Sequence, residues 1–103
     1  MHVISRKPFN DAARLYPNDA DALQRIYRVL RQGTFTSPDE LKAVFPSLDN
    51  FRYKDRWWVI DIGGNNLRLI AFIEFQDSRL YVKHIVSHPD YDTLCRRYAR
   101  RGG

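Results

Sequence analysis

The sequence predicts an α+β fold, in which an N-terminal helical hairpin and a short third helix pack on an antiparallel β-meander of about four strands, followed by a short C-terminal helix. Two observations lead to this prediction. In the first half of the chain, apolar residues recur at the i, i+3, i+4, i+7 spacing of amphipathic helices. From residue 51 on, runs of β-branched and aromatic residues alternate with short turn segments. We therefore expect helices to cover one face of a sheet and to leave the other partly open.

The whole chain, residues 1–103, is expected to form a single domain, because a chain of this length with 44% hydrophobic residues can close one core. Its one cysteine, Cys95, allows neither an intrachain disulfide nor a cysteine-based zinc site, which favours a reducing compartment, the cytoplasm. No stretch approaches the run of about 20 apolar residues that a membrane helix needs. The sequence thus predicts neither secretion nor membrane insertion.

The chain is basic, with a formal charge of +5 from 17 basic and 12 acidic residues. Thirteen of the basic residues are arginine, whose planar guanidinium can hold a phosphate through two hydrogen bonds. This bias indicates a polyanionic partner, nucleic acid above all, although a merely basic and soluble surface explains the composition equally well.

The N-terminal third is expected to hold a short strand and two helices. Residues 2–5 are a candidate first strand. One helix begins at Pro8 and stops before Pro17, and a second, capped by Asn18, ends at Gly33. Their apolar stripes are Phe9, Ala12, Ala13 and Tyr16 in the first helix, and Leu23, Ile26, Tyr27 and Leu30 in the second. Because only Pro17 and Asn18 separate the two patterns, we expect the helices to form a hairpin.

A third, short helix is predicted between Ser37 and Pro46. Ser37 can cap it, Pro38 suits its first position, and Glu40 stands three residues after the cap. The predicted strands that follow span residues 51–53, 57–62, 67–75 and 80–87. They are connected by the short segments 54–56, 63–66 and 76–79. Connections of this length and composition are typical of hairpin turns and predict an antiparallel meander.

Two arginine-rich segments fall outside these core patterns. Arg25, Arg28 and Arg31 share the outer face of the second helix, which is either a solvated surface or a contact for an acidic segment of a partner. Residues 96–103 form a candidate basic tail with four arginines within six residues, either frayed or in contact with phosphate.

The alternation of side chains along the predicted strands places two polar residues in mostly apolar rows. Arg68 shares its predicted face with three other residues, Ile70, Phe72 and Glu74. An arginine beside such an apolar row needs an anion, which either Asp61 on the preceding strand or an external phosphate would supply. In the last strand His84 is the only polar member of a row that also contains Leu80, Val82 and Val86. By itself such a histidine is more often a core or edge residue than a catalytic one.

The segment HIVSHPDYD, residues 84–92, combines histidines, aspartates and a tyrosine. Four of its residues fit the start of a helix, namely Ser87 as the cap and Pro89, Asp90 and Asp92 in the first turns. His88 and Tyr91 are not needed for that cap, and their spacing puts them on one side of the helix. An imidazole beside a phenol on an arginine-rich surface suits metal-free phosphodiester cleavage, in which one group deprotonates a ribose 2′-hydroxyl, another protonates the leaving 5′-oxygen, and arginine offsets the phosphorane charge.

Other kinds of site fit the sequence less well. A metal site could draw on His84, His88, Asp90 and Asp92, but the chain has no HExxH motif and no cysteine pair. Ser87 lies in no nucleophile elbow. The segment 63–66, GGNN, lacks the lysine and the strand-to-helix setting of a phosphate-binding P-loop. We therefore expect neither a metal nor a cofactor.

At this point a family resemblance becomes visible. The runs VIDIGGNNLRLIAFIEF and YVKHIVSHPDYD resemble the HigB family of bacterial toxins, whose signature is a V-F-N-I-G-G-N-x-x-R-L strand pair and a final T-H-x-E-Y-D. LKAVFPSLDNF, residues 41–51, is similar to the segment that the family carries between helices and sheet. The resemblance covers most of the chain and is dense from Leu41 to Asp92. The chain departs from the signature at Asp61, Ser87 and Asp90, where the family has asparagine, threonine and glutamate.

The resemblance implies a RelE/ParE-like fold and a toxin of a type II toxin–antitoxin system. Most HigB proteins are mRNA interferases, endoribonucleases that cut mRNA in the ribosomal A site, and a helix-turn-helix antitoxin, HigA, neutralises them and alone contacts DNA. On this basis we expect His88 and Tyr91 to transfer protons while Arg68, together with Lys54 and Arg56, binds the scissile phosphate. The expected RNA-binding residues are Lys54, Arg56, His84 and Asn65.

Two alternatives stay open. Similar folds in the ParE branch act by binding a protein target such as DNA gyrase, without RNA cleavage. The chain could also be an RNA- or ribosome-binding module that has lost its chemistry. The His-x-x-Tyr-Asp motif argues against the ParE-like alternative, because a pure binder does not need a titrating group there.

Overall fold

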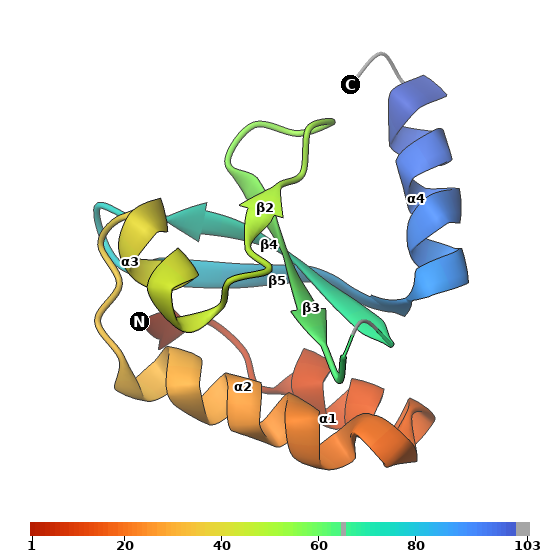
Figure 1. The fold of residues 1–103 in the computed structure, drawn as a ribbon, viewed down its shortest axis with the longest axis horizontal. Coiled ribbons are helices and arrows are strands. Elements are labelled where there is room, and N and C mark those ends of the chain that lie inside the picture. The colour runs from red at the N-terminus through yellow and green to blue at the C-terminus, as the bar shows by residue number, and fades with distance from the viewer. Residues whose placement is uncertain (65, 101–103) are drawn as a thin grey trace.

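In this computed structural model, which describes residues 1–64 and 66–100, a five-stranded sheet has a helical hairpin on one face and a single helix against the other (Figure 1). The elements are β1 (His2–Val3), α1 (Lys7–Leu15), the 3₁₀ turn η1 (Pro17–Asp19), α2 (Ala20–Gln32), α3 (Pro38–Val44), β2 (Asp49–Asn50), β3 (Trp57–Ile62), β4 (Leu67–Glu74), β5 (Arg79–Ser87) and α4 (His88–Arg100). The predicted α+β class is confirmed.

The sheet has the strand order β1-β5-β4-β3-β2. Strands β2 to β5 pair antiparallel with their sequence neighbours, which confirms the predicted meander. The candidate first strand also exists, as the two-residue β1. It pairs parallel to β5, so the complete sheet is mixed and has one strand more than the meander.

Helices α1 and α2 form the predicted hairpin beneath the sheet, and their apolar stripes supply Phe9, Leu23 and Leu30 to the core, each fully buried. The predicted cap of the second helix is wrong by one residue. Asn18 lies inside the 3₁₀ turn η1, and Asp19 occupies the position before α2. The reason is the rigid Pro17, which opens η1 and lets the backbone N–H of Asp19 bond back to the carbonyl of Tyr16 at 2.9 Å.

Helix α3 begins as the sequence predicts. The Ser37 hydroxyl accepts the backbone N–H of Glu40 at 3.2 Å. The Glu40 carboxylate in turn accepts both the backbone N–H and the hydroxyl of Thr36, each at 2.7 Å. These bonds hold the pKa of Glu40 below its ordinary value. The capping box is thus closed through Thr36 rather than through Ser37 itself.

The predicted strand at 51–53 is wrong. The paired residues are Asp49 and Asn50, and the chain then leaves the sheet in a six-residue loop, 51–56, before β3. Phe51 is the cause, because its ring turns inward and is only 2% exposed. The loop closes with Arg56 at a positive φ of 62°, a conformation that returns the backbone to the sheet.

The C-terminal helix is longer than expected. It has 13 residues, and Arg96, Arg97 and Arg100 are helical, so this part of the candidate basic tail is not frayed, while its contact with phosphate stays a prediction. Leu94 explains the continuation, because it is 7% exposed and packs with Phe51 and Ile70 under the helix. Residues 101–103 lie outside the described part of the chain.

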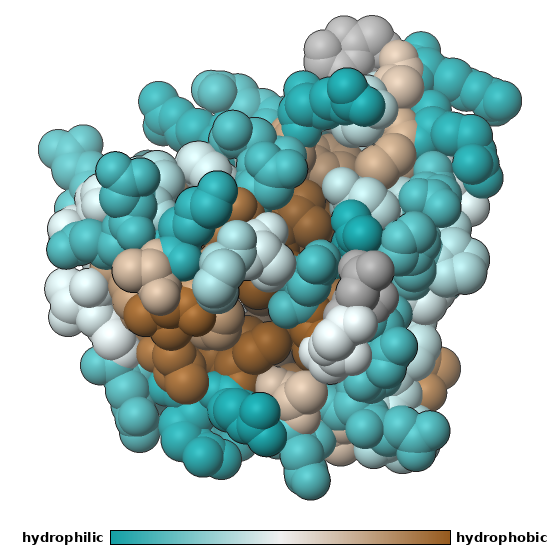
Figure 2. Space-filling model, viewed as in Figure 1, coloured by the Kyte–Doolittle hydropathy of each residue, from teal (hydrophilic) through white to brown (hydrophobic). Residues whose placement is uncertain are grey.

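Two apolar clusters lie on opposite faces of the sheet. The larger one packs the hairpin and α3 against residues such as Ile62, Leu69 and Leu80. The smaller one lies under α4 and is built from Phe51, Val59, Ile70 and Leu94. Figure 2 shows apolar surface between α3 and α2, whereas polar residues cover most of the remaining face. Val44, the last residue of α3, is 47% exposed.

A β-bulge in β5 changes which residues face α4. Ile70 pairs with His84 and the next residue, Ala71, pairs with Val82, so Lys83 is the extra residue. Leu80 and Val82 pack into the larger cluster with the hairpin, while His84 turns to the opposite face. The predicted row that joined His84 to Leu80 and Val82 is therefore wrong, because the bulge interrupts the two-residue alternation.

Candidate functional site

The face of the sheet beneath α4 gathers aromatic rings around Phe51. Four rings contact it, with centroid distances of 5.5 Å for Tyr53, 5.8 Å for Trp57, 6.3 Å for Tyr91 and 5.4 Å for Tyr98. Mostly edge-on contacts of this kind fix the rings relative to one another. They hold α4 and the 51–56 loop in place over the sheet, and polar groups lie at both ends of this aromatic cluster.

One polar group, called the Arg68 centre, lies toward the start of α4. It consists of Asp61, Arg68, His88, Tyr91 and Asp92. Asp61 and Arg68 are cross-strand partners, and their side chains approach to 3.6 Å, so Asp61 is one of the two anions that the sequence left open for Arg68. The guanidinium of Arg68 also lies 4.6 Å from the centroid of the Tyr91 ring. With its side chain only 21% exposed, Arg68 links the sheet to α4.

Tyr91 is held in its neutral form. Burial of the phenol, followed by its hydrogen bond with Cys95, raises the pKa of Tyr91 to about 12, although Arg68 acts in the opposite direction. A phenol with this pKa can donate a hydrogen bond near neutral pH but does not readily become a phenolate.

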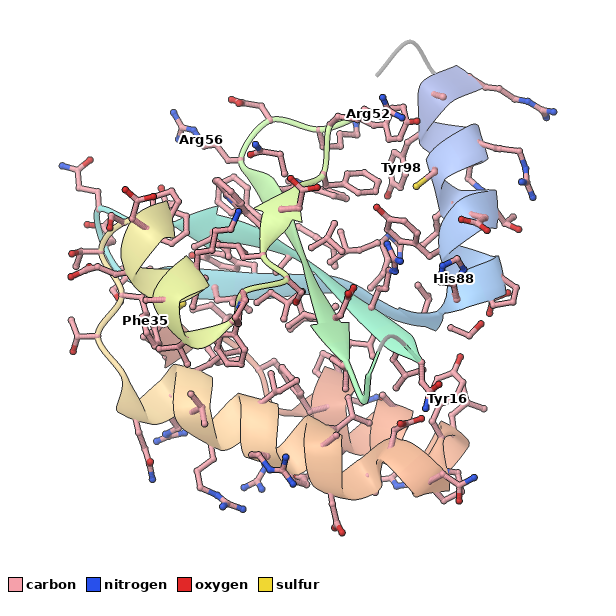
Figure 3. The ribbon with its side chains drawn as sticks, viewed as in Figure 1. Tyr16, Phe35, Arg52, Arg56, His88 and Tyr98 are labelled. Atoms are coloured by element: carbon pink, nitrogen blue, oxygen red, sulfur yellow. The ribbon has the colours of Figure 1, made fainter. Side chains whose placement is uncertain are left out.

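His88 opens α4 and is exposed, and Figure 3 shows it on the first turn of the helix. Its Nδ1 lies 3.6 Å from the carboxylate of Asp92, one helical turn further on. Asp92 thus lies beside His88 in addition to its place near the helix start. The structure brings Arg68 and Tyr91 together as predicted, and places His88 beside Asp92.

A second polar group, called the His84 centre, lies toward the end of α4. It consists of Lys54, Trp57, Lys83, His84, Arg97 and Tyr98. His84 Nε2 and the Tyr98 hydroxyl form a hydrogen bond of 3.0 Å. Lys54 lies 5.6 Å from the Tyr98 ring centroid, and Lys83 lies 5.7 Å from that of Trp57. Cations at these distances interact favourably with the ring faces.

The charged side chains of the His84 centre are all positive. Burial lowers the pKa of His84 from its ordinary value of 6.5, and the positive charges of Arg97 and Lys83 lower it further. His84 is therefore neutral near pH 7. Within residues 1–64 and 66–100, no carboxylate forms an ion pair with Lys54, Lys83 or Arg97.

The remaining predicted RNA-binding residues are distributed differently from the expectation. Lys54 belongs to the His84 centre rather than standing beside Arg68. Arg56 pairs with Asp55 at 3.8 Å, and Figure 3 shows it pointing away from α4, whereas Arg52 on the same loop reaches toward the helix. Asn65 lies outside the described residues.

Sequence reasoning missed four residues of this face, namely Arg52, Trp57, Lys83 and Tyr98. Three of them are sequence neighbours of residues to which the sequence had suggested a role. The bulge at Lys83 and the length of α4, however, cannot be read from the pattern of apolar and polar residues. The signal that could have found Tyr98 is its i, i+7 spacing from Tyr91, which places both rings on one face of a long helix.

The described residues contain neither a cluster of metal-ligating side chains nor a helix that could span a membrane. Within them, no three or more histidine, cysteine, aspartate or glutamate side chains come together as a metal-binding group. No helix in the same residues has the length and apolar character needed to cross a membrane.

Comparison with known proteins gives a consistent picture. A model of the HigB toxin family, described as the RelE-like toxic component of a toxin–antitoxin system, matches residues 19–94. A protein of Escherichia coli O6:H1 (strain CFT073), named mRNA interferase HigB, is 53% identical over 98 residues, which cover 95% of each chain. The mRNA interferase toxin HigB of Escherichia coli K12 is 38% identical over 102 residues, 99% of this chain and 98% of the relative. A protein of Shigella flexneri named mRNA interferase HigB matches equally well.

Proposed function

This chain belongs to the HigB family of RelE-like toxins, as its sequence motifs indicated, and we propose from this premise that it is an endoribonuclease that inhibits translation by cutting mRNA. The relatives that match it nearly end to end are named mRNA interferases. The reaction we propose needs no metal: the ribose 2′-hydroxyl attacks the adjacent phosphate and expels the 5′-oxygen.

Three of the cations that lie over aromatic rings on one face of the sheet carry this proposal. The pairs are Arg68 over Tyr91 at 4.6 Å, Lys54 over Tyr98 at 5.6 Å and Lys83 over Trp57 at 5.7 Å. Single-stranded RNA offers phosphates for the cations and unstacked bases for the rings, so such a face suits it better than it suits duplex DNA. A binding surface for a folded protein target would not need a neutral histidine among the cations.

The residues predicted from the sequence keep their roles in this proposal as RNA-contacting groups. Arg68 and Lys54 bind phosphates, while Arg56 and His84 contact the strand. His88 with Tyr91 is one candidate for proton transfer, and the His84 centre is a second.

We place the reaction on the translating ribosome, in its A site, in the cytoplasm, and we expect a HigA-type helix-turn-helix antitoxin to neutralise the toxin and to provide the only contact with DNA.

The arginine face of α2 supports a protein partner. It borders a cleft of about 520 Å³ lined by Arg6, Gln24, Tyr27, Arg28, Arg31 and Gln32. No carboxylate is among the residues that line this cleft, so an acidic antitoxin segment would meet no like charge there.

The proposal is tested by mapping new mRNA 5′ ends after brief expression of the chain in bacteria. We expect cuts within coding regions of translated messages, and no cuts when translation is blocked beforehand. Lys54→Gln should strongly reduce the cuts, whereas the matched control Lys42→Gln, on the exposed face of α3, should not. Growth arrest without new 5′ ends, together with altered plasmid supercoiling, would instead favour a gyrase-directed toxin.

A further inference from the structure

We infer that the Tyr98–His84 pair is the proton acceptor of the cleavage reaction, with Lys54 as the proton donor. The inference rests on the proposed endoribonuclease function and assigns its chemistry to the His84 centre. It assigns a binding role, rather than proton transfer, to the Arg68 centre.

The geometry of the pair is that of a relay. The Tyr98 hydroxyl lies 3.0 Å from His84 Nε2, and in the tautomer with the proton on Nδ1 it donates its proton to that nitrogen. The two rings are held from the side by Trp57, whose centroid is 5.5 Å from Tyr98 and 6.4 Å from His84. Tyr98 is further fixed by its edge-on contact with Phe51 at 5.4 Å. A preorganised pair of this kind loses little freedom when it reacts.

The surroundings of the pair suit a base and an anionic substrate together. The charged groups that face His84 are Lys83 on its own strand and Arg97 on α4, with Lys54 above Tyr98. They favour the neutral imidazole, which is the form that can accept a proton near pH 7. The same cations attract the phosphate and offset the negative charge of the phosphorane.

The Arg68 centre is less suited to this step. The positive charge of Arg68 is already offset by Asp61 at 3.6 Å, and the side chain is only 21% exposed. Tyr91, with a pKa raised to about 12, is neutral and has no histidine partner among the described hydrogen bonds. His88 has a carboxylate partner, Asp92, which would repel a phosphate.

The two centres lie at different places along α4. Tyr91 and Tyr98 are seven residues apart on α4, which corresponds to about 10 Å along the helix axis. His88 and Tyr98 are ten residues apart, about 15 Å. A base and an acid that act on the same phosphorus must lie within hydrogen-bond reach of its attacking and leaving oxygens. We therefore assign cleavage to one centre and the binding of a neighbouring part of the strand to the other.

The proposed step transfers protons as follows. The Tyr98 oxygen accepts the proton of the ribose 2′-hydroxyl while the Tyr98 proton passes to His84 Nε2. The 2′-oxygen forms a bond to phosphorus, the bond from phosphorus to the 5′-oxygen breaks, and the 5′-oxygen takes a proton from the Lys54 ammonium. The products are a 2′,3′-cyclic phosphate and a 5′-hydroxyl. His84 then releases its proton to solvent and Lys54 regains one.

The test compares four purified variants in single-turnover cleavage of mRNA bound to ribosomes. Tyr98→Phe removes only the hydroxyl and keeps the ring against Trp57, and His84→Gln removes the base. We expect each to lower the rate at saturating toxin by about 10²-fold or more, the usual effect of general-base catalysis. The matched controls Tyr81→Phe and His2→Gln lie outside both centres and should cut at the wild-type rate.

The pH dependence separates a base from a merely structural residue. Because neutral His84 is the reactive form, the wild-type rate should rise with pH through an apparent pKa below 6.5 and then level off. In His84→Gln this rising limb should disappear. The inference is overturned if Tyr98→Phe and His84→Gln cut at the wild-type rate, or if His88→Gln rather than His84→Gln removes the rising limb. A wild-type chain that cuts no mRNA would instead refute the proposed function.

Discussion

Shortening Leu94 to alanine should loosen α4 from the sheet, because this residue is the helix's one fully apolar anchor in the smaller cluster. It is 7% exposed and packs against Phe51, Val59 and Ile70, which are 2%, 4% and 0% exposed. The substitution removes three carbon atoms. At about 0.8 kcal/mol for each, the lost burial is about 2.4 kcal/mol, and the remaining cavity brings the loss of unfolding free energy to about 3 kcal/mol.

Urea denaturation followed by circular dichroism measures this effect. With a slope of about 1.5 kcal/mol/M, the unfolding midpoint of Leu94→Ala should fall by about 2 M. Leu15→Ala is the matched control, because Leu15 is 70% exposed at the end of α1 and should change the unfolding free energy by less than about 0.5 kcal/mol. A loss below about 1 kcal/mol for Leu94→Ala would show that α4 is not packed on the sheet, and the site built on it would then be wrong.

Three further outcomes are expected. Lys83→Gln should raise the apparent pKa of the rising limb of the cleavage rate with pH, because it removes one of the charges that lower the pKa of His84. A pH–rate profile that does not move would contradict this electrostatic account. Gly63→Ala should lower the free energy of unfolding, measured by thermal denaturation, by about 1–2 kcal/mol, because Gly63 has φ +61° and an added Cβ would meet the Asp19 carboxylate. An unchanged melting temperature would exclude that close approach. Ser37→Ala should lower the free energy of unfolding by about 1 kcal/mol in the same measurement, because α3 loses its cap. Ser37→Asp should restore the cap and the lost stability.

The helical half of the fold could be predicted well from the sequence. Its signals are local: the apolar stripe that buries Leu23 and Leu30, the cap at Ser37 and the stop at Pro17 each act within one or two helical turns. The one error, at Asn18, has the same local character, since a proline can open a 3₁₀ turn as well as follow a helix end.

The sheet was predictable in its order but not in its irregularities. The short connections were sufficient for the meander, because hairpins pair neighbouring strands. The bulge at Lys83 and the turn of Phe51 out of the 51–53 segment depend on how α4 packs, which is a long-range contact. No alternation of hydrophobic and polar residues records such a contact, so His84 was assigned to the wrong face.

The candidate site also combines features that the sequence indicated with features that depend on long-range packing. Asp61 was one of the two partners that the sequence offered for Arg68, and the contact between Arg68 and Tyr91 agrees with the motifs that placed both in one site. The association of Lys54 with Tyr98 could not be foreseen, because the C-terminal helix was expected to be short and Tyr98 fell within the candidate basic tail, residues 96–103. The length of α4 therefore decides which basic residues can act together.

The chemical nature of the cut ends tests the central claim most directly. Messages recovered after brief expression can be sorted by whether the downstream fragment begins with a 5′-hydroxyl or a 5′-phosphate, and whether the upstream fragment ends in a cyclic phosphate or a free 3′-hydroxyl. Attack by the ribose 2′-hydroxyl, promoted by the chain's own side chains, predicts a 5′-hydroxyl and a 2′,3′-cyclic phosphate at every new cut. New ends that carry a 5′-phosphate and a 3′-hydroxyl would contradict the account, because they require attack by water.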